Sequence, residues 1–279
     1  MNTEILGVLA IFLFTLVLAW PLGRYIAKTY SGERTWTDPL FGPIERLFFR
    51  VSGIDSNHEM TWVEHLKAML TINFVWFLTS MFVLMNMAWL PLNPDGNPSM
   101  SPDLAFNTSI SFVVNCNLQH YSGESGLSYL GQIWLMFLQF VSAATGMATA
   151  AVLFNALKTR TNVPLKGAGA GPGLGNFYNY FLKSSTRILL PLSILVATLL
   201  MLNGSPMTFE GKDTIVGLQG DTVQVSRGPV AAFVAIKHLG TNGGGFYGAN
   251  SSHPLENPSY LTALLQLFAQ LIIPVAMVF

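Results

Sequence analysis

Long stretches without a charged side chain alternate with shorter charged segments along this sequence. Five stretches contain no Asp, Glu, Lys or Arg, at residues 5–23, 68–94, 125–157, 188–209 and 257–279. A helix needs about 20 predominantly apolar residues to cross the hydrocarbon layer of a bilayer. The pattern therefore predicts five membrane spans, at about 4–23, 64–90, 128–156, 185–203 and 258–279. The last predicted span runs to the final residue, which favours a fragment of a longer protein.

Two further segments are too apolar for ordinary loops and too short to cross a bilayer. They read SPDLAFNTSISFVVNCN at 101–117 and GPVAAFVAIKHLGTNGG at 228–244. Each begins with Ser or Gly before a proline, which is typical of a helix start. Thirteen positions separate Pro102 from Asn115, and thirteen also separate Pro229 from Asn242. The equal spacing predicts an internal repeat of span, half-helix, polar loop and second span.

Half-helices of this kind have electrostatic consequences. A helix of about 12 residues rises about 18 Å, roughly half the hydrocarbon thickness. Its C-terminal carbonyls carry about half a negative charge, and the loop after it must be buried or line a wet cavity. The glycine run Gly243–Gly245 lets successive carbonyl oxygens replace the water shell of a cation, which predicts a potassium site. An ordinary turn is the alternative for the glycine run alone, and Lys237 is expected to point away from the ion path.

The composition supports a membrane protein and limits the chemistry. The chain is 51% hydrophobic and 10% charged, whereas a soluble domain usually carries about 25% charged residues. Its net charge is zero, so no basic footprint indicates nucleic-acid binding. The single cysteine, Cys116, excludes an internal disulfide, and a metal pair with His120 lacks a further ligand nearby. Glu64 and His65, at the edge of a span, have no obvious partner that would indicate an enzyme.

The lysines and arginines indicate which loops face the cytoplasm. They are concentrated after the first span, beginning with Arg24, and between the third and fourth spans, whereas 91–123 contains none. Because cytoplasmic loops are enriched in these residues, we expect 91–123, 204–228 and the N-terminus to lie outside. The alternation in TIVGLQGDTVQV predicts a small outside hairpin with a turn at Gly220 and Asp221.

Four stretches of the sequence carry a family signature. They are PLNPDGNPSMSPDLAFNT (91–108), SFVVNCNLQHYSGESGLSYL (111–130), MTFEGKDT (207–214) and HLGTNGGGFYGANSSHPLENP (238–258). Together they resemble the N-terminal half of the potassium-binding (A) subunit of the Kdp potassium-transporting P-type ATPase, the KdpA family. The implied fold is an all-α polytopic membrane protein with span–pore helix–span repeats of the potassium channel and transporter superfamily, plus one extra N-terminal span.

The spans and the resemblance together predict four units along the chain. These are the extra span and a cytoplasmic loop (1–61), the first repeat (62–160), a glycine-rich cytoplasmic linker (161–184) and a truncated second repeat (185–279) with the outside hairpin at 204–228. Within the third span, SAATGMATAA at 142–151 is typical of a small-residue face on which another helix packs.

The resemblance also assigns the residues of a potassium filter. In the first repeat they are Val114, Asn115, Cys116 and Asn117. In the second repeat they are Thr241, Asn242, Gly243, Gly244 and Gly245. Gln119 and Phe246, which follow the two filters, are interpreted as filter support. Val114 and Cys116 stand where the family often has threonine, a change that matters only if side-chain hydroxyls coordinate the ion.

Function and partners follow from the same resemblance. The A subunit selects potassium from outside and carries no catalytic residues, because a separate P-type ATPase (B) subunit hydrolyses ATP. A single-span C subunit and sometimes a small F subunit complete this complex in the bacterial inner (plasma) membrane. The chain itself contains no phosphate-binding loop and no DKTG motif. A self-standing potassium channel or cation symporter of the same superfamily is the alternative.

Overall fold

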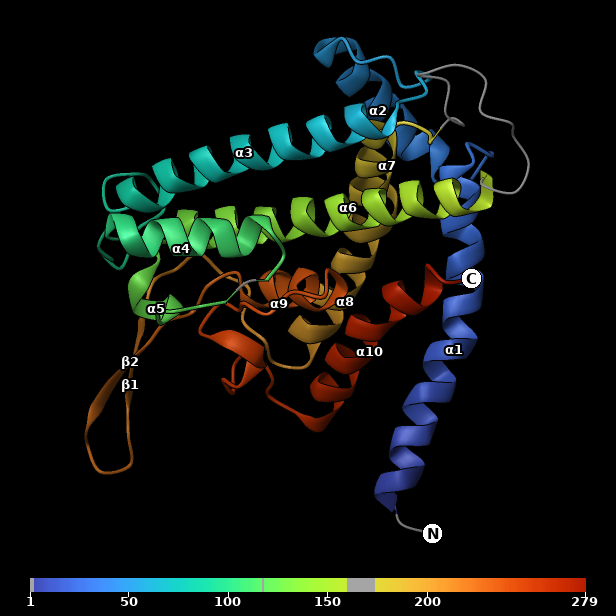
Figure 1. Cartoon of the computed structure of the whole chain (residues 1–279). Coiled ribbons are helices and arrows are strands. Elements are labelled where there is room, and N and C mark those ends of the chain that lie inside the picture. Colours follow the sequence, from blue (N-terminus) through green and yellow to red (C-terminus); the bar gives the residue numbers. More distant parts are fainter. Residues whose placement is uncertain (1–2, 117, 160–173) are drawn as a thin grey trace.

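The chain folds into a bundle of helices with one small hairpin (Figure 1). The structure is a computed structural model, and it describes residues 3–116, 118–159 and 174–279. In chain order the elements are α1 (Thr3–Tyr30), α2 (Asp38–Ser52), α3 (Trp62–Asn86), α4 (Pro102–Val113), α5 (Gly123–Gly126), α6 (Tyr129–Thr159), α7 (Phe177–Lys183), the π-helix η1 (Ser184–Leu189), α8 (Leu190–Leu202), β1 (Asp213–Val216), β2 (Thr222–Val225), α9 (Val230–Leu239), the 3-10 helix η2 (Ala249–Ser251) and α10 (Tyr260–Ala276). The predicted helical fold class is confirmed, and most of the glycine-rich linker lies outside the described residues.

Four of the five predicted spans are confirmed as helices of spanning length. Within the described part of the chain, four helices are long and apolar enough to cross a membrane: Ile5–Tyr30, Trp62–Asn86, Tyr129–Lys158 and Phe177–Leu202. The fifth predicted span is α10, whose 17 residues fall short of the roughly 20 that a crossing needs. The fourth begins well before the predicted 185, because Asn176 caps it by accepting a hydrogen bond from the amide of Asn179.

The π-helical turn η1 joins α7 to α8 within this fourth span. Pro191 follows it and has no N–H to donate to the carbonyl of Arg187. That carbonyl instead accepts a hydrogen bond from the Tyr25 hydroxyl, at 3.2 Å. A gap in the helical hydrogen bonding is thus satisfied by a side chain of α1, which ties α1 to the fourth span.

The two half-helices occupy equivalent places in the bundle. α4 packs against α3 and α6, the spans on either side of it in the sequence. α9 packs in the same way against α8 and α10, and it also touches α6. The predicted succession of span, half-helix, loop and span is therefore present twice (Figure 1). The half-helices end at Val113 and Leu239, before the predicted Asn115 and Asn242.

α6 is the central helix of the bundle and α1 is a peripheral one. In the most apolar window of each helix, 56% of the residues are buried in α6 but only 11% in α1. The small-residue face predicted at 142–151 contributes to this burial, since Ala143, Ala144 and Ala148 are all buried. Small side chains let backbones approach closely, and a Cβ on Gly240, after α9, would lie 3.1 Å from the Cβ of Ala143.

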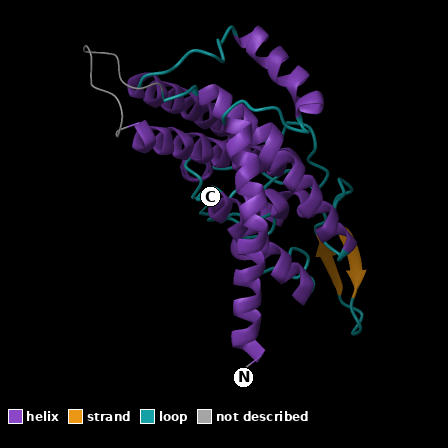
Figure 2. Ribbon diagram, turned by 90° about the vertical axis from the view of Figure 1, so that its right-hand side faces the viewer, coloured by secondary structure: helices purple, strands orange, loops and turns teal. Residues whose placement is uncertain are grey.

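The hairpin and α2 lie outside the spans. β1 and β2 form an antiparallel hairpin with Asp213 opposite Val225, which confirms the predicted hairpin and stands apart from the helices (Figure 2). Its turn places Gly220 at φ +85°, a conformation that favours glycine. α2 occupies a segment that the sequence analysis assigned to a cytoplasmic loop. The residues at its two ends are typical of helix boundaries, with a proline in the first turn and Gly53 at φ +68° after the last turn.

Candidate functional site

α4 and α9 end in the same backbone geometry. The residue after the helix cap lies in the left-handed region in both, with φ 62° at Asn115 and 54° at Thr241. The next amide donates to the carbonyl five positions back, at 2.9 Å for Cys116 and 2.8 Å for Asn242. This Schellman arrangement usually places glycine in the left-handed position. A β-branched Thr241 is strained there, and such strain is concentrated at functional sites.

The shared geometry corrects the register of the repeat. Equal spacing from the two prolines pairs Asn115 with Asn242, but the left-handed residue equivalent to Asn115 is Thr241, one position earlier. The difference arises at the helix starts, because α4 begins at Pro102 whereas Pro229 lies just outside α9. The two half-helices are therefore 12 and 10 residues long rather than equal.

The ends of the two half-helices meet through Asn115. Its Nδ2 donates to the carbonyl of Gly240 at 3.1 Å, and its Oδ1 accepts from the hydroxyl of Ser142 on α6 at 2.9 Å. Asn115, Gly240 and Thr241 line a shared hollow of about 190 Å³, together with side chains of α6 and α10. Because each helix C-terminus carries about half a negative charge, this hollow is electrostatically suited to a cation.

Two glutamines of α6 hold the glycine-rich loop that follows α9. Gln139 donates from Nε2 to the carbonyl of Gly244 at 3.1 Å, and Gln132 donates to the carbonyl of Phe246 at 2.9 Å. Both glutamine side chains are completely buried. They lie seven positions apart and therefore share one face of the helix. This face of α6 fixes the path of the loop.

Gln119, from the loop after α4, supports the same glycine run. Its Oε1 accepts a hydrogen bond from the N–H of Gly245 at 3.0 Å. A Cβ on Gly245 would lie 2.3 Å from the carbonyl oxygen of Gly248 and 2.6 Å from Oε1 of Glu256, so only glycine fits there. The structure thus brings Gln119 and Phe246 to the glycine run, and their supporting role stays a prediction.

A buried ion pair lies beside the glycine run. Lys237 Nζ is 3.7 Å from Oε2 of Glu256 and donates to the hydroxyl of Ser251 at 2.8 Å. The side chains of Lys237 and Glu256 are 1% and 0% exposed. Oε1 of Glu256 accepts from the amide of Tyr247 at 3.0 Å, so the pair also fixes the backbone beyond the glycines. The charge of Lys237 is therefore neutralised within the protein, while the expectation that Lys237 points away from an ion path stays a prediction.

The predicted filter residues differ in exposure between the two loops. Val114 is 60% exposed and Cys116 is exposed as well. Gly244 and Gly245 are buried, as is Asn242. Asn117 lies outside the described residues. The first loop therefore reaches the surface of this chain, whereas the second is exposed at Thr241 and buried from Gly244 to Tyr247.

Two carbonyl oxygens beside the glycine run are available to a cation. Oδ1 of Asn242 and Oε1 of Gln139 are buried without a hydrogen-bond partner in the described part of the structure. Burying an oxygen without a donor costs about 1–3 kcal/mol, and a bound cation would remove that cost. No group of three or more His, Cys, Asp or Glu among the described residues could hold a metal ion of another kind.

The sequence analysis missed three residues that shape this site. Gln132 and Gln139 are two of the polar positions within an uncharged predicted span, and such residues usually face the interior of a helix bundle. Their spacing of seven was the signal that could have identified a shared polar face. Glu256 is the acidic residue closest to the last predicted span, and its pairing with Lys237 had no sequence signal because η2 and its flanking turns bring the two together.

Half-helices that enter a bundle between spans and end at a shared polar loop define a class, the membrane proteins with span–half-helix–span repeats. Residues 9–279 match the family described as "KdpA: Potassium-transporting ATPase A subunit". The chain belongs to this family.

The curated relatives cover all or nearly all of this chain. It is 64% identical over 279 residues to a "Potassium-transporting ATPase potassium-binding subunit" of Flavobacterium psychrophilum, matching 100% of this chain and 47% of the relative. The protein of the same name from Flavobacterium johnsoniae is 65% identical with the same coverage. That of Alicyclobacillus acidocaldarius is 45% identical over 277 residues, covering 98% of this chain and 48% of the relative. The chain thus spans about half the length of the relatives it matches.

Proposed function

We propose that this chain forms the potassium-selecting part of an ATP-driven potassium import complex. The observation that carries the proposal is the meeting of two half-helix ends at Asn115 and Gly240, beside a glycine run held by α6. Two negative helix ends and a turn of carbonyl oxygens favour a bare cation. The relatives' printed name, potassium-binding subunit, supports potassium as that cation.

In this proposal, potassium gives up its water to backbone oxygens of the two loops. The proposed filter consists of Val114, Asn115, Cys116 and Asn117 in the first repeat and Thr241, Asn242, Gly243, Gly244 and Gly245 in the second. Gln119, Gln132 and Gln139 hold the loops so that the oxygens are aligned before the ion arrives. A site fixed in this way does not have to reorganise when the ion binds.

We further propose that the pore and the pump need parts beyond this chain. Two repeats make two sides of a four-sided filter, and the chain spans about half the length of its relatives. A P-type ATPase (B) subunit would hydrolyse ATP, and a single-span C subunit and a small F subunit would complete the complex. The distribution of Lys and Arg favours an inner-membrane protein with its N-terminus and hairpin outside. The proposed units are 1–61, 62–160, 161–184 and 185–279.

Ion selectivity of the full complex tests this function. ATP hydrolysis by the wild-type complex should respond to potassium much more strongly than to sodium. Gly244→Asp introduces a side chain and a charge among the carbonyls, so the preference for potassium should fall by about tenfold or more, equivalent to about 1.4 kcal/mol. Lys212→Gln, in the hairpin, is the control and should leave the preference unchanged.

Two results would contradict the proposal. An unchanged ion preference in the Gly244→Asp complex would remove the filter assignment. Potassium flux that needs no ATP and no partner chain would favour the self-standing channel or symporter.

A further inference from the structure

A groove lies at the C-terminal end of α1, separate from the half-helices. It has a volume of about 620 Å³ and is formed by the last turns of α1 and the loop that follows them. The side chains that determine its chemistry are Arg24, Tyr25, Lys28, Glu33, Arg34 and Trp36. A ligand of several atoms therefore fits beside three cations and two aromatic rings.

The three cations of the groove are unpaired. Arg24, Lys28 and Arg34 are exposed, and none of them forms an ion pair with a carboxylate of the described chain. The guanidinium of Arg24 lies 3.8 Å from the centre of the Trp20 ring, a cation–π contact that leaves its hydrogen-bond donors available. Glu33 is the carboxylate that lines the groove, so positive charge remains in excess.

The groove lies at the depth of lipid headgroups. The uncharged part of α1, residues 5–23, rises about 28 Å at 1.5 Å per residue. This length matches the hydrocarbon thickness of about 30 Å. Arg24 then stands at the edge of the hydrocarbon, and Lys28 lies one turn, about 6 Å, beyond it. Trp36, which is 77% exposed, is a residue type enriched at this interface.

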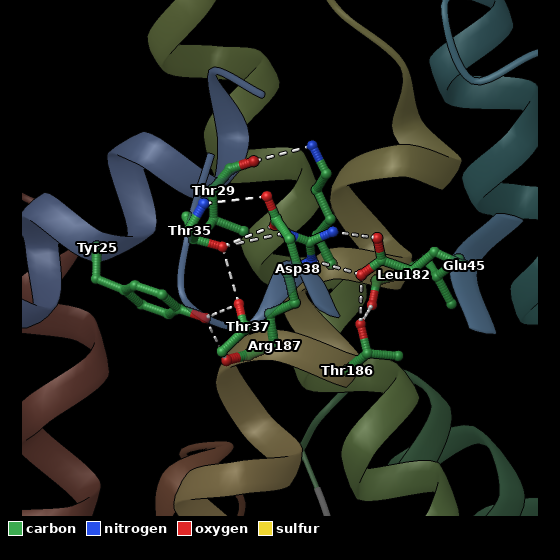
Figure 3. Close-up of polar contacts among 10 residues, drawn as sticks. Tyr25, Thr29, Thr35, Thr37, Asp38, Glu45, Leu182, Thr186 and Arg187 are labelled. Carbon is green, nitrogen blue, oxygen red and sulfur yellow. Dashed lines mark hydrogen bonds and ion pairs between the residues drawn. The ribbon is translucent and has the colours of Figure 1, made fainter. Parts of the chain in front are cut away.

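Hydrogen bonds hold the loop 31–37 against the end of α1 (Figure 3). The Tyr25 hydroxyl shares a hydrogen bond of 2.8 Å with the hydroxyl of Thr37. The hydroxyl of Thr35 donates to Oδ1 of Asp38 at 2.8 Å, and its backbone amide donates to Oδ2 at 3.1 Å. The groove is therefore built before any ligand arrives.

Arg187, from the fourth span, anchors the start of α2, which directly follows this loop (Figure 3). Its side chain is 8% exposed and forms ion pairs with both Asp38 and Glu45 of α2. Burial alone would raise the pKa of Asp38, but hydrogen bonds from Thr35 and the Arg187 guanidinium lower it below its ordinary value. Both carboxylates are thus occupied by Arg187 and do not neutralise the cations of the groove.

α2, which this network anchors, is a second indication that the groove lies at the level of the lipid headgroups. α2 exposes an apolar stripe at helical spacing, formed by Leu40, Ile44, Leu47, Phe48 and Val51. Arg46 and Arg50 are exposed on a different face of the same helix. A helix with one apolar and one basic face lies in the plane of the membrane interface.

An apolar track leads away from the groove along α1. Leu9, Leu13 and Val17 are exposed and follow one another at intervals of four. Residues four or seven apart share a helix face, so Arg24, seven positions after Val17, and Lys28, four positions after Arg24, continue the same strip. The cations thus stand at the end of a strip on which an acyl chain can lie.

We propose that this groove binds the phosphate headgroup of an anionic phospholipid, whose acyl chain lies along α1. Free phosphate has the same headgroup chemistry, but it would leave the apolar track uncovered. The ligand is therefore a lipid rather than a soluble anion. The proposal does not depend on the ion-selective site, so the two can fail separately.

Native mass spectrometry of the full complex in detergent tests the proposal by giving the apparent Kd for added dioleoyl phosphatidylglycerol. Lys28→Gln/Arg34→Gln should weaken binding of the first lipid about 25-fold, at about fivefold for each lost cation. The matched control is Arg46→Gln/Arg50→Gln, which removes two cations from α2 outside the groove and should change the Kd less than about threefold. Binding of dioleoyl phosphatidylcholine should be the same in all three complexes.

Each contrary result would overturn the proposal. Equal losses in the two double variants would indicate a diffuse attraction to the basic surface. Displacement of the lipid by inorganic phosphate would assign the groove to a soluble anion, and an unchanged Kd would place the lipid elsewhere. If the double variant does not assemble, Arg34→Gln alone should still weaken binding about fivefold, and no change there would also refute the site.

Discussion

The loops after α4 and α9 begin alike and continue differently. Both start with a left-handed residue, Asn115 or Thr241, and the same hydrogen-bonded turn. The first loop then runs at the surface, where Cys116 is exposed, while the second is buried at Gly244 and Gly245. The repeat thus reproduces the end of the half-helix, which determines the electrostatic field at the site. The residues packed around each loop determine how rigidly that loop is held.

α6 accounts for this difference, because it packs against both half-helices but supports them unequally. Among the described residues it offers Gln132 and Gln139 to the second loop and Ser142 to the start of the first, while Gln132 also donates to the carbonyl of Gly123 further along the first. Oxygens that are already fixed stabilise an ion without the cost of reorganising around it. We therefore expect the second loop to dominate ion selection among the residues of this chain and the first loop to adjust it.

Removing the charge of Glu256 should have the largest effect on the second loop. It leaves the ammonium of Lys237 buried without a counter-ion, and breaking a buried ion pair costs about 3–5 kcal/mol. We expect Glu256→Gln to lower the unfolding temperature of the complex strongly in a thermal denaturation measurement. Lys237→Met/Glu256→Gln removes both charges and should recover most of the lost stability. Equal losses in the single and double variants would show that the ion pair is not the cause.

Gly245→Ala should have the next largest effect, because its Cβ would collide with the carbonyl of Gly248. Moving this backbone displaces the adjacent carbonyls, so the potassium concentration that half-activates ATP hydrolysis should rise about tenfold or more, or about 1.4 kcal/mol. Gly248→Ala is the matched control, since a Cβ there meets nothing within 4 Å. Similar effects of both alanines would argue against a rigid second loop.

Gln139→Leu and Ser142→Ala compare the support of the two loops directly. The first removes the hydrogen bond to Gly244, and a bond of this kind contributes about 1 kcal/mol, so half-activation should need about fivefold more potassium. The second removes the bond to Asn115 in the more exposed loop and should have about a twofold effect. The reverse order would mean that the first loop dominates ion selection.

Val114→Thr and Cys116→Thr should have the smallest effects. Both side chains are exposed, and surface substitutions usually change free energies by less than about 0.5 kcal/mol. Potassium half-activation should therefore stay within about twofold of wild type. A clear gain in potassium affinity would show that a hydroxyl group in the first loop coordinates the ion.

The parts of the fold that follow from local patterns could be predicted from the sequence. Charge-free stretches located the spans, and a proline followed by a short apolar run located α4 and α9. The alternation around Gly220 located the hairpin. These features depend on residues close in sequence, so one chain contains the necessary information.

The features that were predicted wrongly or missed depend on where helices begin or on contacts between residues far apart in the sequence. The register of the two loops was wrong by one position, because Pro102 lies within α4 and Pro229 outside α9. α2 was assigned to a loop because charged residues alternate with apolar ones along its sequence, among them Glu45, which Arg187 pairs from another helix. The support from Gln139 could not be predicted, because it depends on how α6 and α9 pack.

The central claim is that the two half-helix ends and the glycine run form one potassium site. The most direct measurement is the anomalous scattering of thallium, a heavier monovalent substitute for potassium, in crystals of the full complex. The account predicts a peak at the glycine run, within coordination distance of loop oxygens from both repeats, and loss of that peak in the Gly244→Asp complex. A thallium site elsewhere in the protein, with none beside Asn115 and Gly244, would contradict it.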